Sequence, residues 1–259
     1  MKMGLAVDFH GREGFPDWKS IKAQALLAEE MGFDIVVIPD HLLYHQENGK
    51  HIGAWESVSM AGALAETTDS IRIGHSMFNT PYRPPALMAK IAESLDEISG
   101  GRYILGLGAG NTPDAEYAAF GIDADPRYSR FAESLHIIHT LLKKGQVDYQ
   151  GTYWSAQEAH MVLRGPRPQG PPIMIAAHSP KMMRLAAQYA DAWNGWVMKP
   201  TLDIFQAMVD DQKKACLEMD RDPDTLRLTL DLNIDHTGYY AEHRSGSPME
   251  PIQGTTKEI

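Results

Sequence analysis

Short apolar segments alternate along the chain with longer segments in which apolar residues recur every three or four positions. Strands that are buried on both faces give short, continuously apolar runs, and parallel sheets contain such strands. The seventh run differs, because it alternates apolar and polar residues. The predicted strands lie at 3–7, 35–38, 71–74, 103–107, 173–176, 192–196 and 226–234.

Recurrence at three and four residues is typical of amphipathic helices that cover a sheet. Gly32 follows the first such stripe and Gly100-Gly101 follow the third, where helix C-termini commonly place glycine. The predicted helices are centred on 21–28, 58–65, 87–98, 131–142, 183–190 and 204–215.

Seven βα-type units with no change of composition predict one α/β domain over residues 1–259, a TIM (β/α)8-type barrel. No G-x-G-x-x-G motif follows the first strand, which disfavours two Rossmann halves. The stretch 145–172 interrupts the alternation with four glycines and four prolines. We expect it to be an inserted loop with a hairpin near Val147–Trp154.

Composition narrows the classes of partner. Acidic residues outnumber basic ones by 34 to 24, which argues against nucleic acid or an anionic membrane as the main partner. A single cysteine, Cys216, excludes an internal disulfide framework and suits a reducing cytoplasm. No apolar run approaches the roughly 18 residues of a membrane span. We therefore expect a cytoplasmic protein that acts on a small-molecule substrate.

Polar residues follow several of the predicted strands, and the reacting groups of a barrel come from the carboxyl ends of its strands. Asp40 and His41 close the second strand. A histidine at the barrel mouth can pass a proton near neutral pH, and the alternative is a histidine hydrogen-bonded to a neighbouring loop. Lys199 follows the sixth strand and could meet an anionic substrate group, although such a lysine is more often solvated.

Two turns could hold an anion. The fourth strand ends in Gly106–Gly110, where glycines let backbone N–H groups approach an anion closely, and the alternative is a tight turn without a ligand. His178 and Ser179 precede a helix whose first N–H groups could bind phosphate. The alternative there is N-capping by Ser179 before Pro180. An acidic protein that binds a phosphorylated cofactor should use such local backbone dipoles.

A metal-dependent hydrolase barrel is an alternative hypothesis that belongs to a different functional class. It needs a metal-bridging group on the fourth strand, where Tyr103–Gly110 offers only Tyr103 and backbone. We therefore expect no metal. Its candidate ligands are Asp8, His10, His41, His75, His178 and Asp235.

Longer motifs follow one another in a characteristic order from about residue 1 to 196. In that order and spacing they resemble the bacterial-luciferase-like flavin-dependent oxidoreductases, and within them the deazaflavin branch, which uses coenzyme F-420. The motifs are EEMGFD at 29–34 with PDH at 39–41, AETT at 65–68, IRIG at 71–74, YRPPALMAK at 82–90, LDEISGGR at 95–102, LGLGAG at 105–110 with Glu116 and Phe120-Gly121, GTYW at 151–154, PIMIAA at 172–177 and ADAWN at 190–194.

The resemblance implies a TIM barrel that binds coenzyme F-420 or FMN at the strand C-termini and performs hydride transfer, or oxygen activation with FMN. Asp40 would lie near the ring system, and His41 would donate a proton or orient the substrate. Ser76–Met77 would match a non-prolyl cis peptide behind the ring, and Asn79 would contact the cofactor. The family often dimerises, so a homodimer stays open, as does a non-catalytic flavin-binding remnant. The residues that would hold the ribityl phosphate are Gly108, Ala109, Gly110, His178 and Ser179.

Two departures from the family pattern stand out. Sugar-phosphate dehydrogenases of the deazaflavin branch have a glutamate just after the fourth-strand glycines, where this chain has Asn111, and a tryptophan shortly after the histidine, where this chain reads LLYH at 42–45. Asparagine cannot act as a general acid or base, so that substrate class is in doubt. The segment 251–259 resembles the helix start before the family's last strand. We therefore expect the eighth βα unit to be missing and the sequence to be truncated at its C-terminus.

Overall fold

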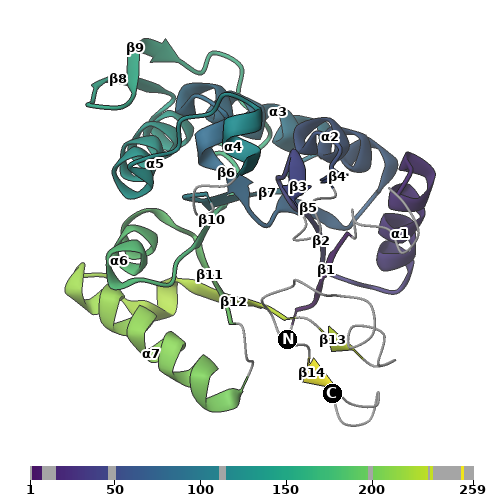
Figure 1. The fold of residues 1–259 in the computed structure, drawn as a ribbon. Helices are drawn as coiled ribbons and strands as arrows, with labels where there is room; N and C mark the ends of the chain where they lie inside the picture. The colour runs from purple at the N-terminus through teal and green to yellow at the C-terminus, as the bar shows by residue number, and fades with distance from the viewer. Residues whose placement is uncertain are drawn as a thin grey trace. The chain divides into compact units, whose positions relative to one another are not determined.

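The computed structural model describes residues 2–7, 16–45, 51–110, 115–197, 201–232, 234–235 and 252–253. The chain divides into two compact units (Figure 1). Unit 1 comprises Met1–His45 and Gly49–Met174, and unit 2 comprises Gln46–Asn48 and Ile175–Ile259. The expectation of one domain over 1–259 stays a prediction.

Unit 1 contains a sheet of parallel strands in the order β1, β2, β5, β7. Val36 lies opposite Leu5 on one side and Ile73 on the other, so the apolar strands that the sequence predicted are adjacent. A two-residue strand, β6, continues alongside the carboxyl half of β7. The bounds are β1 (Gly4–Ala6), β2 (Ile35–Ile38), β5 (Arg72–His75), β6 (Phe78–Asn79), β7 (Tyr103–Gly108) and an antiparallel hairpin of β3 (Leu43–His45) and β4 (His51–Gly53).

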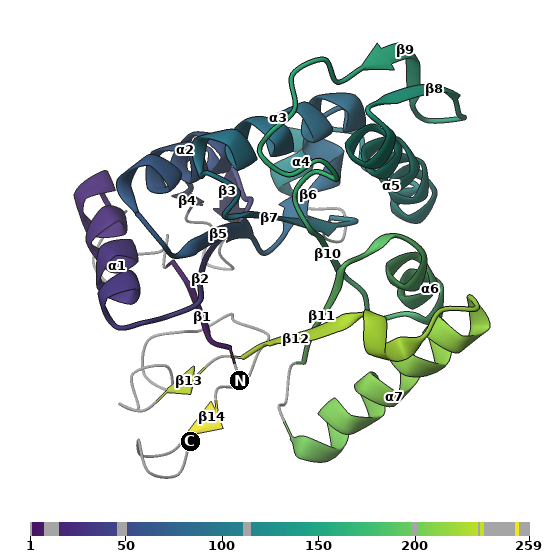
Figure 2. The ribbon, with the colours of Figure 1, turned by 180° about the vertical axis from the view of Figure 1, so that it is seen from behind.

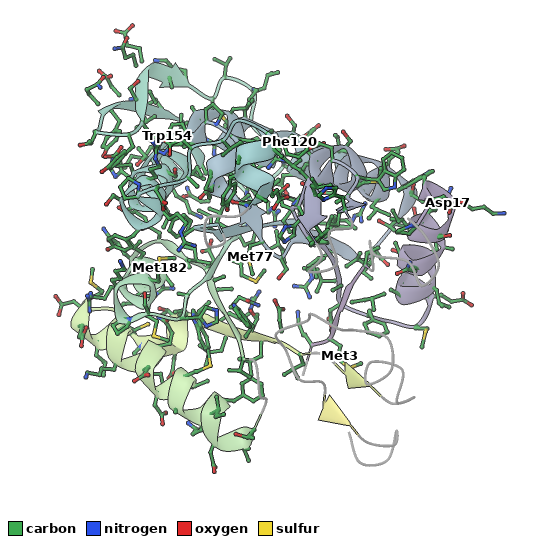
Figure 3. All side chains as sticks on the ribbon, viewed as in Figure 1. Met3, Asp17, Met77, Phe120, Trp154 and Met182 are labelled. Atoms are coloured by element: carbon green, nitrogen blue, oxygen red, sulfur yellow. The ribbon has the colours of Figure 1, made fainter. Side chains whose placement is uncertain are left out.

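Helices α1, α2 and α3 cover one face of these strands (Figure 2). Their apolar stripes bury side chains such as Ile21, Leu64 and Met88 completely. Asp17, labelled in Figure 3, caps α1 by accepting the backbone N–H of Ser20 at 2.8 Å. The bounds are α1 (Trp18–Glu30), α2 (Ser57–Thr67), η1 (Thr80–Tyr82), α3 (Pro85–Ile98), α4 (Ala115–Ala119) and α5 (Arg127–Lys144).

The inserted stretch contains the expected hairpin, formed by β8 (Gln146–Gln150) and β9 (Ser155–His160). Glu133 of α5 holds the turn between the two strands, because its carboxylate accepts three consecutive backbone N–H groups at 2.9 Å. The donors are Thr152, Tyr153 and Trp154, the last of which is labelled in Figure 3.

The segment that follows the hairpin is bound to α3 by two ion pairs. Arg164 Nε lies 2.8 Å from Glu93 Oε1, and the Arg167 guanidinium contacts both carboxylate oxygens of Asp96. Glu93 and Asp96 are buried. The stretch is therefore an insertion, as predicted, that is attached to the helix layer.

Unit 2 begins within β10 (Ile173–Ala176), which leads the chain out of unit 1. Trp193 is fully buried, and its indole N–H donates to the Ala177 carbonyl at 2.8 Å. Gln212 ties α7 to α6 by donating to the Met183 carbonyl at 3.2 Å. The other elements are α6 (Pro180–Tyr189), the parallel pair β11 (Ala192–Trp196) and β12 (Arg227–Asp231), α7 (Leu202–Glu218), η2 (Pro223–Thr225) and the parallel pair β13 (Ile234–Asp235) and β14 (Ile252–Gln253).

The seven predicted strands and six predicted helices are all present, which confirms the α/β class. The pattern did not predict β3, β4, β6 or α4, because elements of two to five residues are too short to show a period. No helix in the part of the chain that the structure describes is long and apolar enough to cross a membrane.

Arg102 should contribute measurably to the stability of unit 1. Its guanidinium donates to the carbonyl oxygens of Ala65 and Thr68 at the end of α2 and to that of Ile71 before β5, at 2.6 to 2.9 Å. Arg102→Ala leaves these acceptors without their donor, so we expect a loss of about 2 kcal/mol in the free energy of unfolding, measured in urea. Arg184→Ala removes only an exposed ion pair and should cost less than about 0.5 kcal/mol. Equal losses in the two variants would contradict this assignment.

Candidate active site

A buried carboxylate stands two residues after β2. Asp40 is only 2% exposed. It accepts hydrogen bonds from the Ser57 hydroxyl at 2.5 Å, from the Asn79 backbone N–H at 2.8 Å and from two nitrogens of Arg83 at 2.7 and 3.0 Å. These four hydrogen bonds to one carboxylate form a network, which joins β2, α2 and β6 at their ends.

Arg83 completes this network between η1 and α3. It also contacts Glu56 Oε1 at 2.8 Å, and its guanidinium lies 5.0 Å from the centroid of the Phe78 ring. Burial lowers the pKa of Arg83, but hydrogen bonds and charge attraction from Asp40 and Glu56 outweigh it and raise that pKa overall. The Arg83 guanidinium is therefore charged and is held in place by Asp40 and Glu56.

His41 is held by a second buried carboxylate. Its Nδ1 lies 3.2 Å from Glu116 Oε2, and Glu116 Oε1 accepts the backbone N–H groups of Leu42 and Leu43 at 2.5 and 3.0 Å. The Glu116 side chain is 1% exposed, whereas that of His41 is 23% exposed. The imidazole is thus anchored on one edge and partly open to solvent elsewhere.

Glu116 is ionised at neutral pH. Burial raises the pKa of its carboxyl, but the hydrogen bonds from His41 and from two backbone N–H groups outweigh burial and lower the pKa to about 2. The Tyr82 hydroxyl faces this carboxylate without the geometry of a direct hydrogen bond. Burial, followed by the nearby Glu116, raises the pKa of Tyr82, which keeps the phenol neutral.

The peptide bond between Ser76 and Met77 is cis, which confirms what the resemblance implied (Met77 is labelled in Figure 3). The segment passes very close to β7. A Cβ atom on Gly106 would lie 1.8 Å from the His75 carbonyl oxygen, and one on Gly108 would lie 3.3 Å from the Met77 Cβ. Glycine at these positions is therefore explained by close packing of the chain against itself.

Gly110 ends the same turn, after the half-buried Ala109. Its φ is +86°, and a Cβ atom there would lie 2.3 Å from the Tyr117 hydroxyl and 2.7 Å from Asn79 Oδ1. The Tyr117 hydroxyl donates to this same Asn79 oxygen at 2.9 Å. Asn79 is thereby fixed at both its backbone N–H and its side-chain oxygen.

Replacement of Gly110 by alanine should therefore lower the free energy of unfolding by about 3 kcal/mol, because backbone strain and steric overlap add. Gly121 is a matched control, since its φ is +67° but nothing lies within 4 Å of an added Cβ. Gly121→Ala should cost about 1 kcal/mol for the left-handed backbone alone. Urea unfolding of both variants measures the difference, and equal costs would show that the contacts around Gly110 yield easily.

The second predicted anion site lies in unit 2. Ser179 is the N-cap of α6 and Pro180 is its first residue, but the Ser179 side chain does not hydrogen-bond a first-turn N–H group. Side-chain capping, the alternative that the sequence left open, is therefore not what this serine does. His178 is exposed, with its ring edge-on to that of Trp196 at 5.0 Å.

The structure brings Asp40, Ser76, Met77, Asn79 and the residues of the glycine turn together in unit 1, with His41 beside them. His178 and Ser179 belong to unit 2. Lys199 lies outside the described residues, as do Asp8, His10, Asn111 and the side chain of Asp235.

His75, a candidate metal ligand, is fully buried in unit 1. Its Nδ1 lies 2.7 Å from the Tyr103 hydroxyl, and its ring stacks on Phe78 at 3.7 Å between centroids. Burial lowers the pKa of His75 to about 4, so the imidazole is neutral. Among the described residues, no group of three or more His, Cys, Asp or Glu side chains could hold a metal ion.

Sequence reasoning gave no role to Glu116, Arg83, Tyr82 or Tyr117. Glu116 and Arg83 lie inside motifs quoted for the resemblance, so the motifs were the available signal. What the sequence could not give was the pairing, because Glu116 is 75 residues from His41 and Arg83 is 43 residues from Asp40.

Comparisons with known proteins identify the family of the chain. Residues 1–234 match the model of the luciferase-like monooxygenase family. The F-420-dependent glucose-6-phosphate dehydrogenase of Microbacterium testaceum is 31% identical over 86% of this chain and 67% of its own length. The 4-hydroxyprotoasukamycin monooxygenase of Streptomyces nodosus subsp. asukaensis is 32% identical over 69% of this chain and 47% of its own length. The chain thus spans about half to two thirds of these curated relatives.

A solved structure of an F-420-dependent secondary alcohol dehydrogenase, in complex with an F-420–acetone adduct, superposes on 93% of this chain and 72% of its own. The TM-score is 0.79 at 18% sequence identity. The likeness shows the fold, which is the TIM-barrel type that the sequence predicted. The chain belongs to the luciferase-like monooxygenase family.

Proposed function

We propose that this chain is an oxidoreductase that binds coenzyme F-420 or FMN and acts on a small organic substrate. The observation that carries the proposal is the partly exposed His41 imidazole, held on a buried ionised Glu116 at the carboxyl end of β2. Such a histidine can move a proton at a defined point, which oxidation of an alcohol or reduction of a carbonyl requires. Family relatives named for F-420-dependent dehydrogenation and for monooxygenation support the reaction class.

The described residues fit such a coenzyme within each unit taken by itself. In unit 1, Asp40 and Asn79 are held by hydrogen bonds to the chain, and the Ser76 N–H donates to the Ile38 carbonyl at 3.0 Å, so these residues form a fixed surface beside Met77. The turn Gly108–Gly110 offers backbone N–H groups. In unit 2, the backbone N–H groups at the start of α6 are available to a phosphate group. The Ser179 hydroxyl is available to the same phosphate, because it does not cap the helix.

When bound, the coenzyme supplies hydride transfer, or oxygen activation if it is FMN. The chain's own residues then have separate roles. His41 exchanges a proton with the substrate, and Lys199 attracts an anionic substrate group. Asp40 and Asn79 keep the surface beside the coenzyme rigid. Ser76 and Met77 support the coenzyme from behind.

The proposal also covers the cell compartment and the partners of the protein. A net charge of −10 disfavours nucleic acid as a partner, and one cysteine in 259 residues suits the cytoplasm. The resemblance to a family that often dimerises leaves a homodimer as an expectation, which sedimentation would test.

Titration with oxidised and reduced F-420 and FMN, followed by ring absorbance and fluorescence, tests the proposal. We expect one of the two coenzymes to bind with a micromolar or lower Kd. Riboflavin is the matched control for FMN because it lacks only the phosphate, and it should bind at least about tenfold more weakly if the backbone N–H groups hold that phosphate. Binding of neither coenzyme would overturn the proposal.

A further inference from the structure

We propose that Glu116 fixes the proton of His41 on Nδ1, so that Nε2 is the nitrogen that exchanges a proton with the substrate. The inference rests on the proposed function, in which His41 is the catalytic residue. Glu116 affects the reaction through His41 and does not touch the substrate itself, so it is a positioning residue.

The hydrogen-bond partners of the Glu116 carboxylate require the His41 proton to be on Nδ1. An ionised carboxylate only accepts hydrogen bonds, and a backbone N–H only donates. Glu116 Oε1 is taken by the N–H groups of Leu42 and Leu43, at 2.5 and 3.0 Å. Oε2 faces His41 Nδ1 at 3.2 Å, so Nδ1 must carry the hydrogen. A neutral imidazole with its hydrogen on Nδ1 has its lone pair on Nε2.

The groups around this contact keep the carboxylate ionised. The Glu116 side chain is 1% exposed, and its hydrogen bonds lower its pKa to about 2 against the effect of burial. Tyr82 faces Glu116 as a neutral phenol, since burial and the carboxylate raise the pKa of Tyr82. The Tyr44 ring lies 4.4 Å from the His41 ring and tilts by 36°, which limits rotation of the imidazole. A buried carboxylate that orients a histidine in this way is a recurring catalytic device.

Two other glutamates show what Glu116 does in addition to supporting a loop. Glu29 accepts the consecutive backbone N–H groups of 69–71, and Glu133 accepts those of 152–154. Neither of them contacts a histidine in the described part of the chain. In Glu116, Oε1 accepts the loop N–H groups of Leu42 and Leu43, and Oε2 faces His41 Nδ1. A role confined to loop support would not need that second contact.

The test is ¹⁵N NMR of the whole protein labelled at histidine, without coenzyme, with the His41 signals assigned by their loss in His41→Gln. We expect the wild type to carry the proton on Nδ1. In Glu116→Gln the amide oxygen should stay with the two backbone N–H groups, which turns the amide nitrogen toward Nδ1 as a donor. The proton should then move to Nε2. With the coenzyme bound, turnover should fall about 100-fold while coenzyme affinity changes less than about twofold.

Glu133→Gln makes the same substitution at a glutamate that only supports a loop, and it should leave the His41 tautomer and turnover unchanged. A wild-type proton on Nε2 would overturn the inference, and so would a Glu116→Gln variant that keeps the proton on Nδ1. If Glu116→Gln fails to fold, the wild-type spectrum alone decides. Failure to bind either coenzyme would overturn the proposed function and leave the tautomer result intact, so the two failures are distinguishable.

Discussion

His41→Ala is expected to lower turnover by roughly 10²- to 10⁴-fold and to leave coenzyme affinity within about twofold. The reason is geometric, because the imidazole is held through Nδ1 by Glu116 and its other edge is left for the substrate. Removal of the ring takes away the proton-transfer group but none of the backbone N–H groups at Gly108–Gly110 or at the start of α6. The change in coenzyme absorbance with a panel of small alcohols and carbonyl compounds measures turnover.

His160→Ala is the control for this experiment, since His160 is exposed on β9. It should change neither turnover nor coenzyme affinity. If His41→Ala lost turnover and affinity by the same factor, the histidine would be a binding residue and the proton-transfer role would be wrong.

Asp40→Asn is expected to lower the free energy of unfolding by about 3 kcal/mol, because it removes the buried partner of Arg83, whose side chain is only 12% exposed, and leaves that charge with the exposed Glu56 alone. The new amide nitrogen would also face donors in every arrangement. One carboxylate oxygen accepts from Ser57 and Arg83, and the other accepts from Asn79 and Arg83. Urea unfolding monitored by tryptophan fluorescence measures the loss.

Glu56→Gln tests the same arginine from its exposed side. The Glu56 side chain is 46% exposed, but it also caps α2 by accepting the N–H groups of Val58 and Ser59. Glutamine keeps one acceptor oxygen for these contacts, so the loss should stay below about 2 kcal/mol. A cost for Asp40→Asn as small as that of Glu56→Gln would show that Arg83 does not depend on the buried partner.

The order of strands and helices could be predicted because each has a period that the sequence displays. β10 and β11 were predicted to the residue, and β2 was as well. The short hairpin of β3 and β4 could not be predicted, since three residues give no recognisable alternation.

The candidate site could be predicted only in part. Asp40 and His41 were found because polar residues at strand ends lie at the mouth of a barrel. Their partners Arg83 and Glu116 come from other elements, and a pairing across 43 or 75 residues leaves no trace in local spacing. The physical chemistry of a site depends on such pairs, so local spacing predicted where His41 lies along the chain but not how its ring is oriented.

The glycines in and just after β7 have a role that the sequence alone did not identify. The sequence suggested that they make room for an anion, and the structure shows that the chain itself occupies the space beside Gly106 and Gly110. Both roles remain compatible, because the backbone N–H groups are separate from the missing side chains. Glycine alone does not distinguish a ligand from close packing.

The attachment of the 145–172 insertion to α3 bears on whether the insertion can move as a lid. Insertions beside a barrel often act as lids that open and close. Here Glu93 and Asp96 grip the segment after the hairpin through Arg164 and Arg167, and the Glu93 carboxylate also accepts the Gly165 N–H at 2.5 Å. To open as a lid, the segment would have to break the ion pairs of Arg164 and Arg167 with the buried carboxylates of Glu93 and Asp96. The segment after the hairpin is therefore a fixed part of unit 1 that stays with α3.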